Sequence, residues 1–483
     1  MMNHAARPAP PPGLLALERR VAADLEALTL PPKPWVPRLE RNGEAVLDVA
    51  VVGAGMNGIA AAGTLIFKGI GNVLLLDENP PGLEGPWVTW ARMDTLRSPK
   101  TLAGPCFGIP SLTFRAWYTA SRGEAAWEAL YKIPNAVWQD YLSWLQRVLA
   151  LPVRHRTKVT RIVPEEGVLR LLFADGASLL ARRVVLATGR AGSGGLALPE
   201  VVDRSLWPDL AAHANAPIDF ERLRGKRVAV IGGGASAWDN AATALERGAK
   251  EATLYVRRTH LPQINKGRGS AGPGYQLGWG DLDDASRWLL VTYMYDNQSP
   301  PPHETVHRAL RLPGFGIQLG APTLATRREG DEVVLTLGGA EPREVRADFL
   351  IAGTGFRVDL DHVPELAGLA PHIARWGDCY VPPDHLRRPE MEAFPYLGRA
   401  FELTPKGEAA PEEIGRIHLL SYGAHASHGG IASDIPGVAA ASERLANGIA
   451  AHFFREDQEA VRAELAAFDE PELETTPFFI PRG

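Results

Sequence analysis

The sequence predicts an α/β fold that contains two Rossmann-like, three-layer nucleotide-binding domains. Two observations predict it. Residues 49–58 and 227–237 each place a glycine-rich turn between a β-branched apolar run and an alanine-rich run, a succession typical of strand, turn and helix. Each turn is followed along the chain by another apolar run, at 73–76 and at 252–256, which indicates the next strand of a parallel sheet. Two such units in one chain indicate two nucleotide cofactors.

The first glycine fingerprint is followed by acidic residues at the position that selects an unphosphorylated ribose. Glycine lets the backbone turn tightly and approach a pyrophosphate, and the following helix offers free N–H groups and the positive end of its dipole. The strand at 73–76 ends in Asp77 and Glu78, where a carboxylate meets the ribose 2′-hydroxyl. We therefore expect FAD here, bound by Gly53, Gly55, Asn57, Gly58 and Asp77.

The second fingerprint is followed by a cationic strand end instead. The strand at 252–256 ends in Arg257 and Arg258, with no carboxylate at its tip. Guanidinium groups bind phosphate bidentately, so this pair favours the 2′-phosphate that distinguishes NADPH from NADH. We expect NADPH here, bound by Gly232, Gly234, Ser236, Arg257 and Arg258.

Composition excludes several classes of protein. The chain has 483 residues, a formal net charge of −5 and only two cysteines, Cys106 and Cys379. The charge argues against a nucleic-acid partner, and no apolar run approaches the length of a membrane span. The scarcity of cysteine indicates a reducing compartment, and we expect a cytoplasmic location. The lack of a C-x-x-C pair excludes reductases that relay electrons through a disulfide, while self-association is left open.

The chain begins with an arm rather than a domain. Residues 1–43 are rich in proline and contain one amphipathic stretch, from Leu14 to Leu28, which is expected to be a packing helix. Beyond it, two apolar runs end in Ala187-Thr188-Gly189 and Ala352-Gly353-Thr354-Gly355, turns that bring backbone against a cofactor.

These motifs predict an NADPH domain inserted into an FAD domain. The FAD domain is expected to occupy residues 44–225 and 348–483, and the NADPH domain residues 226–347. Within the latter, residues 260–315 are rich in glycine, proline and aromatic residues and interrupt the α/β pattern. We expect this insert to cover the substrate entrance.

The order of these motifs resembles the class B flavoprotein monooxygenases, which comprise flavin-containing monooxygenases, Baeyer–Villiger monooxygenases and siderophore-type N-hydroxylases. Glu84-Gly85-Pro86-Trp87 resembles the family's Gly-Gly-x-Trp segment, and residues 96–100 resemble the stretch that reads Leu-Arg-Asp-Pro in the N-hydroxylases. Near the C-terminus, residues 427–434 resemble the His-Gly-x-x-Asp segment that opens a helix against the flavin. The resemblance spans nearly the whole chain after the arm.

The resemblance implies an NADPH- and O₂-dependent monooxygenase that acts on a small organic substrate, by N-hydroxylation or another heteroatom oxygenation. In such enzymes NADPH reduces FAD, and the C4a-(hydro)peroxyflavin formed with O₂ transfers one oxygen atom, so that no protein nucleophile is required. The residues implied near the reactive part of the flavin are Ser98, Lys100, His428 and Asp434. Further cofactor contacts are implied for Trp87, Thr188, Gly189, Thr354 and Gly355.

Other interpretations of the same residues stay open. Lys100 could be a surface cation, and Asp434 could cap a helix N-terminus. Only His213 matches the family's Phe-x-Gly-x-x-x-His signature, which argues against Baeyer–Villiger oxygenation. An NADPH oxidase or flavin reductase would use the same two sites, and a non-catalytic nucleotide-binding sensor would keep both fingerprints. A metal site is not expected, because no acid or cysteine cluster accompanies His425 and His428.

Overall fold

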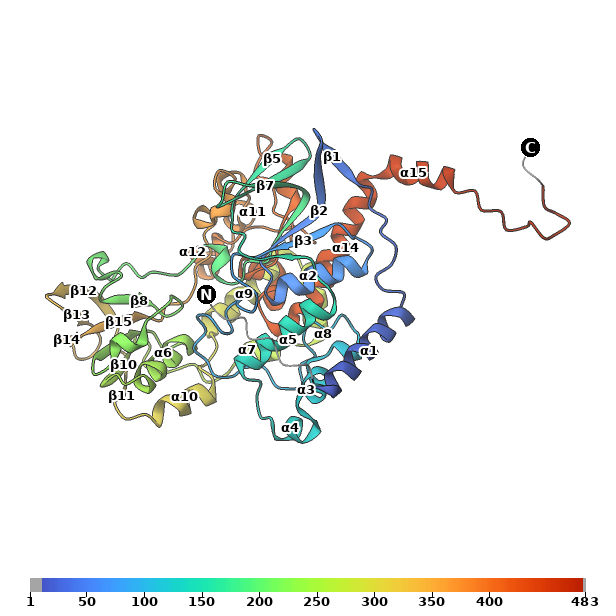
Figure 1. Ribbon diagram of the computed structural model, residues 1–483. Coiled ribbons are helices and arrows are strands. Elements are labelled where there is room, and N and C mark those ends of the chain that lie inside the picture. The colour runs from blue at the N-terminus through green and yellow to red at the C-terminus, as the bar shows by residue number, and fades with distance from the viewer. Residues whose placement is uncertain (1–10, 481–483) are drawn as a thin grey trace.

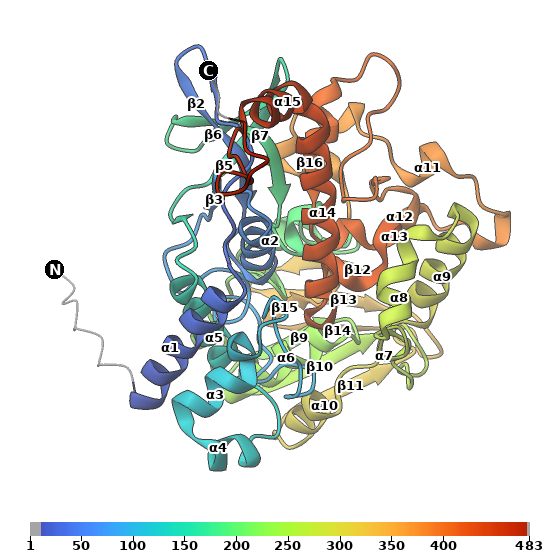
Figure 2. The ribbon, with the colours of Figure 1, turned by 90° about the vertical axis from the view of Figure 1, so that its right-hand side faces the viewer.

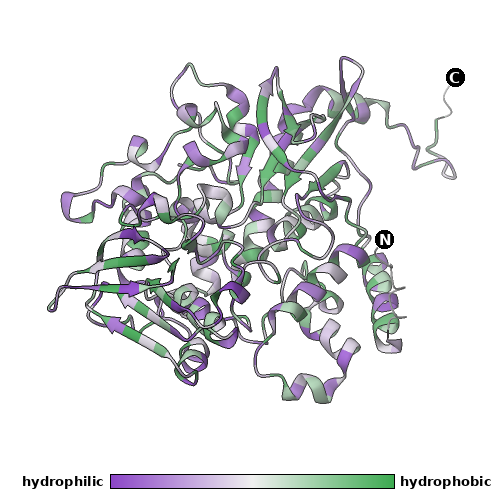
Figure 3. Cartoon of the chain, turned by 60° about the vertical axis from the view of Figure 1, so that its left-hand side comes forward, coloured by the Kyte–Doolittle hydropathy of each residue, from purple (hydrophilic) through white to green (hydrophobic). Residues whose placement is uncertain are grey.

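The computed structural model describes residues 11–480, which form two lobes, each built around a sheet (Figure 1). The observed fold class is α/β, as predicted. Figure 3 shows apolar residues concentrated on the central strands of both lobes and polar residues on the surrounding loops and helix faces. Within residues 11–480, no helix is both long enough and apolar enough to span a membrane.

The first lobe is centred on an eight-stranded sheet with the order β4-β3-β2-β7-β6-β5. Strand β1 pairs with β2, and β16 pairs with β7 from the C-terminal part of the chain. The β2, β3, β4, β7 and β16 pairings are parallel, whereas β5, β6 and β7 form an antiparallel meander. The strands are β1 (Leu39–Arg41), β2 (Glu44–Val52), β3 (Val73–Leu76), β4 (Val153–Arg154), β5 (Val159–Glu165), β6 (Val168–Phe173), β7 (Ser178–Leu186) and β16 (Ile417–Leu419).

The second lobe contains a five-stranded parallel sheet with the order β11-β10-β9-β15-β8 and a three-stranded antiparallel sheet, β12-β13-β14. The strands are β8 (Ala211–His213), β9 (Arg227–Ile231), β10 (Glu251–Val256), β11 (Phe315–Leu319), β12 (Thr323–Glu329), β13 (Glu332–Leu337), β14 (Arg343–Ala347) and β15 (Phe349–Ala352).

The five-stranded sheet includes strands from outside residues 226–347, the range expected for the NADPH domain. Strand β8 comes before residue 226 and β15 comes after residue 347, yet both pair within the second sheet. Strand β15 lies between β9 and β8, so the sheet is closed by segments on either side of the expected range. The difference arises because pairing joins strands that are distant in sequence, which a pattern of local motifs does not reveal.

Helices cover both sheets. In the first lobe α2 (Met56–Phe67) packs against the C-terminal helix α14 (Val438–Glu456), which runs beside it in Figure 2. In the second lobe α6 (Ala235–Glu246) packs on β10 and against α10 (His303–Leu310). The remaining helices of the first lobe and its C-terminal extension are α3 (Phe114–Arg122), α4 (Glu124–Ala129), α5 (Asn135–Val148), α11 (Trp376–Cys379), α12 (Pro389–Glu392), α13 (His425–His428) and α15 (Gln458–Ala467).

The first part of the insert, residues 266–297, packs against the C-terminal part of the first lobe, whereas α10 stays on the second lobe. Its helices α8 (Pro273–Gly278) and α9 (Asp284–Asn297) lie beside α12 and α13 in Figure 2, and α7 (Lys266–Gly269) packs against α9. Trp279 and Trp288 of the insert share a buried apolar cluster with Trp376 and Phe394 from the C-terminal part. The insert therefore covers the segment that contains the expected flavin-proximal residues 427–434.

The described part of the N-terminal arm carries the expected helix, α1 (Pro12–Ala27). Its Leu17 and Val21 are buried, while Leu15 and Leu28 stay exposed. The helix packs against α3, and Glu18 accepts hydrogen bonds from Trp144 Nε1 at 3.1 Å and from Arg147. Residues 1–10 of the expected arm lie outside the described part of the chain.

Candidate active site

The first fingerprint forms a turn that only glycine permits. Gly53 has φ +101°, and a Cβ on it would lie 2.5 Å from the carbonyl oxygen of Ala187. A Cβ on Gly58 would overlap the carbonyl oxygen of Gly53, so this glycine allows α2 to approach the turn. Gly55 precedes α2 in an extended conformation. The space at its Cβ position is open, since a Cβ there would meet only Gly85, at 3.7 Å. The N-terminal N–H groups of α2 thus face a space fit for a pyrophosphate.

Asp77 is buried at the end of β3 and holds this turn. Its Oδ2 accepts a hydrogen bond from Ala54 N at 2.8 Å, and its Oδ1 accepts from Asn79 N at 2.8 Å. Glu78, the alternative acid, is exposed and pairs with Lys158 at 2.9 Å. Of the two acids, Asp77 therefore has the position next to the fingerprint, and its carboxylate oxygens keep lone pairs for a ribose hydroxyl.

Asn57, expected to be a cofactor ligand, uses its side-chain amide nitrogen in contacts with the C-terminal part of the chain. Its side-chain nitrogen donates to Leu420 O at 3.1 Å and to Ala432 O at 2.7 Å. Both donor hydrogens of the amide are thereby used to tie α2 to the C-terminal part of the chain. Asn57 fixes the relative position of the fingerprint and the flavin-proximal segment, rather than offering its amide N–H groups to a ligand.

Several polar atoms around the first fingerprint have no protein partner. Trp87 Nε1 and Thr188 Oγ1 are buried and make no hydrogen bond to any of the residues 11–480. Gly189, directly after Thr188, has φ +68°, and a Cβ there would meet nothing within 4 Å. Buried donors are rarely left unpaired in native proteins, so unpaired donors beside an open glycine turn fit a polar organic ligand such as FAD.

The second fingerprint repeats this geometry in the other lobe. Gly232 has φ +122°, and its Cβ would lie 2.5 Å from Gly353 O. Gly234 precedes α6 and has open space where a side chain would be, and Ser236 lies half-buried in the first turn of that helix. The N-terminus of α6 is therefore accessible to phosphate, as the NADPH assignment requires.

Arg257 and Arg258 directly follow β10, the strand beside β9. Within residues 11–480 neither guanidinium makes a hydrogen bond or an ion pair, although the charge of Arg258 acts on Asp296 and that of Arg257 on Tyr295. Cations left free at this strand end suit a phosphate ligand.

Thr354 and Gly355 link the lobes. Thr354 Oγ1 donates to Ala197 O, and Ala197 N donates to Gly355 O at 3.0 Å. The Thr354 hydroxyl is thus engaged with the chain, whereas Gly355 has φ +81° and open space at its Cβ position. Of these two expected cofactor contacts, only the Gly355 backbone is placed to approach a ligand closely.

Two of the four residues expected near the flavin have structural partners instead. The Lys100 ammonium donates to Trp127 O at 2.7 Å and to Glu128 O at 3.3 Å, at the C-terminal end of α4. This position satisfies helix-end carbonyls and the negative end of the helix dipole. The Lys100 ammonium therefore holds the end of α4, and its expected place near the flavin stays a prediction.

His428 is also enclosed by protein. Its Nε2 donates to Gly398 O at 2.9 Å, its Nδ1 accepts from Arg444 at 3.1 Å, and its ring packs on Phe401 at 4.0 Å between centroids. Burial, and then the neighbouring Arg444 charge, lower the pKa of His428 to about 3. Both nitrogens of the neutral ring are thus engaged with protein partners, and a role of His428 near the flavin stays a prediction.

Asp434 and Ser98 remain available. Asp434 is exposed, its side chain does not cap the following helical turn, and it lies 3.5 Å from the Arg190 guanidinium. Ser98 is half-buried in the loop between β3 and α3. Sequence reasoning missed three neighbours of Asp434, namely Arg190, Tyr422 and His425, although Arg190 directly follows the Thr188-Gly189 turn.

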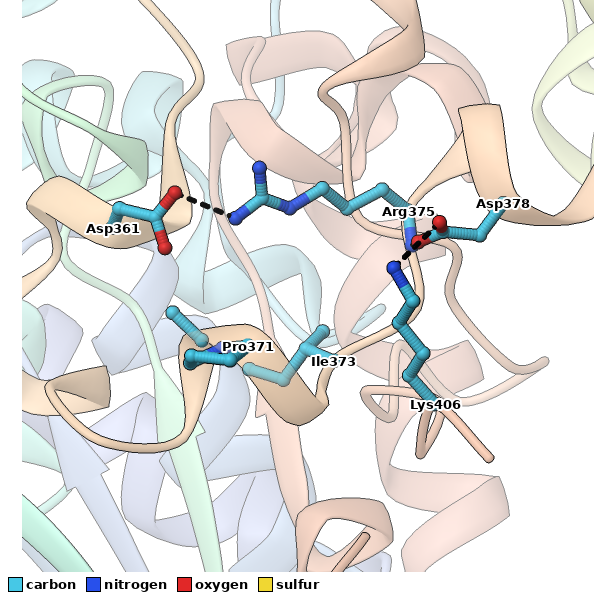
Figure 4. A pocket seen from close by; sticks show the side chains of 7 residues that line it. Asp361, Pro371, Ile373, Arg375, Asp378 and Lys406 are labelled. Atoms are coloured by element: carbon cyan, nitrogen blue, oxygen red, sulfur yellow. Dashed lines mark hydrogen bonds and ion pairs between the residues drawn. The ribbon is translucent and has the colours of Figure 1, made fainter. Parts of the chain in front are cut away.

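A separate cavity of about 440 Å³ lies in the C-terminal part of the first lobe. Its lining includes Arg375, paired with Asp361 at 2.9 Å, and Lys406, paired with Asp378 at 2.7 Å (Figure 4). None of the residues predicted from the sequence lines this cavity. Its four charged side chains are therefore paired with one another.

Comparison with known proteins decides the family. An FAD-NAD(P)-binding family model matches residues 50–191, and an L-lysine 6-monooxygenase/L-ornithine 5-monooxygenase model matches residues 129–268. An FAD-dependent urate hydroxylase from Xanthomonas campestris is 41% identical over 463 residues, which is 95% of this chain and 97% of that protein. The chain belongs to the class B flavoprotein monooxygenases.

Solved structures agree on the fold of this monooxygenase. Ornithine hydroxylase from Pseudomonas aeruginosa matches with a TM-score of 0.64 at 19% identity, covering 84% of this chain and 99% of that one. L-lysine 6-monooxygenase from Pseudomonas syringae matches with a TM-score of 0.63 at 19% identity and the same coverage. The protein is accordingly an FAD- and NADPH-dependent monooxygenase that acts on a small organic substrate.

Proposed function

We propose that the substrate is an oxopurine of the urate class and that the reaction is its hydroxylation. The observation that carries the proposal is the 41% identity to an FAD-dependent urate hydroxylase, because the aligned region covers nearly the whole of both chains. Both lobes, both fingerprints and the insert are therefore included in the likeness, rather than the nucleotide-binding parts alone. A cytoplasmic location and self-association are further parts of the proposal, to be tested by fractionation and light scattering.

In this proposal each lobe binds one of the two cofactors. The first-lobe turn at Gly53, Gly55 and Gly58, with Asp77, binds FAD, and the second-lobe turn with Arg257 and Arg258 binds NADPH. Bound FAD supplies hydride acceptance and O₂ activation, which no side chain provides. The balanced reaction consumes NADPH, a proton, O₂ and substrate, and it releases NADP⁺, water and the hydroxylated product.

The protein's own residues would position the substrate and exclude water. The insert seals the C-terminal segment, since Trp279 packs against Gly429 and Trp288 lies in the same apolar cluster as Trp376. Exclusion of water strengthens the electrostatic interactions inside the site and suppresses side reactions of reactive intermediates. Coupling of NADPH oxidation to hydroxylation is therefore expected to depend on this cover.

A second candidate is N-hydroxylation of a primary amine of the ornithine or lysine class. The match of residues 129–268 to the L-lysine 6-monooxygenase/L-ornithine 5-monooxygenase model favours it. That match covers less of the chain than the urate hydroxylase does, so we rank it second.

The test is a coupling assay on purified holoenzyme. NADPH and O₂ consumption and peroxide release are measured alone and with urate, L-ornithine, L-lysine, a sulfide or a ketone. Urate is expected to accelerate consumption, suppress peroxide and give a product 16 mass units heavier, the mass of one inserted oxygen atom. The same response to an amine in place of urate would establish the second candidate. Constant peroxide release with every compound would identify an oxidase, and no turnover at all would identify a nucleotide sensor.

A further inference from the structure

Side chains from three distant segments meet beside the first-lobe turn. Arg190, just after Thr188-Gly189, lies 3.5 Å from Asp434, and its Cζ lies over the Tyr422 ring, 5.5 Å from the centroid. The Tyr422 ring in turn lies 6.0 Å from the ring of His425. We call Arg97, Arg190, Tyr422, His425 and Asp434 the cleft cluster.

Arg97 joins this cluster from the loop after β3. Its guanidinium makes no hydrogen bond or ion pair with any residue in the range 11–480, but it interacts electrostatically with Asp239, Arg190 and Asp434. Desolvation lowers the pKa of Arg97, although its side chain is exposed. The Arg97 guanidinium is therefore close enough to Arg190 and Asp434 for their charges to act on it.

The cluster carries an excess of positive charge. Asp434 faces both Arg97 and Arg190, and the other nearby acid, Asp239, is buried and shared with Arg308 at 3.7 Å. The Arg190–Asp434 pair is largely exposed and its contact is long, so it constrains Arg190 weakly. Two neighbouring guanidiniums with one loosely held carboxylate favour an anionic ligand.

His425 adds an unpaired hydrogen-bonding atom. Its Nδ1 is buried and has no partner among residues 11–480. Burial lowers the pKa of His425, so its ring is neutral and offers one donor and one acceptor nitrogen. The aromatic faces of Tyr422 and His425 complete a site that suits a flat heterocycle with N–H and C=O groups.

We propose that the cleft cluster is the substrate subsite, in which Arg97 and Arg190 bind the anionic oxopurine and His425 hydrogen-bonds its ring. This inference rests on the proposed function and names the residues that select the substrate's charge. Urate, the anion of uric acid, would displace Asp434 from Arg190, because its carbonyl oxygens and delocalised charge match the guanidinium fork.

The test measures the Kd of urate for oxidised holoenzyme, together with FAD content and the KM for NADPH. Arg97→Gln and Arg190→Gln are each expected to raise the urate Kd about ten- to hundredfold, the usual effect of losing charge-assisted hydrogen bonds. FAD content and the KM for NADPH are expected to be unchanged. Arg190→Lys is expected to restore part of the affinity.

Asp434→Asn supplies a test with the opposite sign. Removing the competing carboxylate is expected to lower the urate Kd, a result that a merely structural residue would not give. Arg311→Gln, an exposed arginine at the end of α10 in the second lobe, is the matched control and is expected to change nothing.

Three outcomes would overturn the inference. An unchanged urate Kd in both arginine variants would remove the substrate role alone, provided that the wild-type enzyme hydroxylates urate. Loss of FAD, or a raised KM for NADPH with normal urate affinity, would assign the arginines to a cofactor phosphate. A wild-type holoenzyme that neither binds nor hydroxylates urate would refute the proposed function and this inference together.

Discussion

The guanidinium of Arg444 donates a hydrogen bond to Nδ1 of His428 across 3.1 Å, joining α14 to the segment expected to face the flavin. Arg444 also donates to Gln276 O at 2.7 Å and to Leu277 O at 3.0 Å in the insert. The pair therefore connects three parts of the chain that are far apart in sequence. From this relationship we predict that loss of His428 weakens the contact between the insert and α14 before it affects the chemistry.

We predict that His428→Leu lowers the free energy of unfolding by roughly 1–3 kcal/mol, because it leaves Gly398 O and one N–H group of Arg444 without a partner. The rate of flavin reduction by NADPH in the folded variant is expected to stay near that of the wild type. Thermal unfolding and stopped-flow absorbance measure the two effects. Arg444→Met should reproduce the loss of stability. A His428→Leu protein that is as stable as the wild type but whose flavin is not reduced by NADPH would show that His428 takes part in the reaction.

Burial of His428 also predicts how stability responds to acid. Its pKa falls from an ordinary 6.5 to about 3 on folding, so its contribution is fully present above pH 6.5 and is lost as pH falls toward 3. His428→Gln cannot be protonated, so its melting temperature should fall less than that of the wild type between pH 7 and pH 5. His418, whose pKa burial also lowers to about 3, leaves residual pH dependence in the variant. Parallel melting curves for the two proteins would contradict the assignment.

The buried carboxyl of Asp48 predicts a pH dependence of stability opposite to that of His428. Burial raises its pKa from 3.8 to about 6, and the hydrogen bond from Asn72 and the charges of Arg182 and Arg38 offset this only partly. A carboxyl that binds its proton more tightly when folded costs stability as pH rises from 3.8 through 6. At about 1.36 kcal/mol per pKa unit, Asp48→Asn should be more stable above pH 6 by up to about 3 kcal/mol, with no gain below pH 4. Denaturant titrations check this, with the exposed Asp331→Asn as control.

The two glycines of the first fingerprint should respond differently to a methyl group. Gly58→Ala forces a Cβ into Gly53 O and is expected to give a poorly folded protein without bound flavin. Gly55→Ala meets only Gly85 at 3.7 Å, so this variant should fold and should lose FAD affinity only if the ligand approaches Gly55. Circular dichroism and the visible flavin spectrum separate the cases. Normal flavin content in Gly58→Ala would refute the site.

We predict that Arg257 and Arg258 make the enzyme select NADPH over NADH. Their joint replacement by alanine should raise the KM for NADPH by about one to two decades, the equivalent of roughly 1.5–3 kcal/mol for charge-assisted bonds to phosphate. The KM for NADH should change little, because NADH has no 2′-phosphate. Arg311→Ala, in the same lobe, serves as control. An enzyme that prefers NADH before mutation would refute the assignment.

Local sequence predicted the backbone of both nucleotide turns but not the partners of the polar side chains around them. Gly53 and Gly232 have the positive φ that the fingerprints require. In contrast, Lys100 and His428 occupy motif positions and are nevertheless engaged with carbonyl oxygens of Trp127 and Gly398. A motif specifies a backbone conformation over a few residues, whereas the partner of a long side chain is supplied by whichever distant segment packs against it.

The sequence by itself therefore determined that this chain has two dinucleotide turns, with an acid after one and arginines after the other, because glycine spacing and strand ends are local properties. Only the tertiary structure decided which strands complete the second sheet, where β8 and β15 join β9. It also decided that Arg190 and Asp434 lie beside Tyr422 and His425, while the Asn57 amide donates to backbone carbonyls of the C-terminal part. The physical reason is that burial and charge pairing depend on contacts between segments hundreds of residues apart, which no local pattern records.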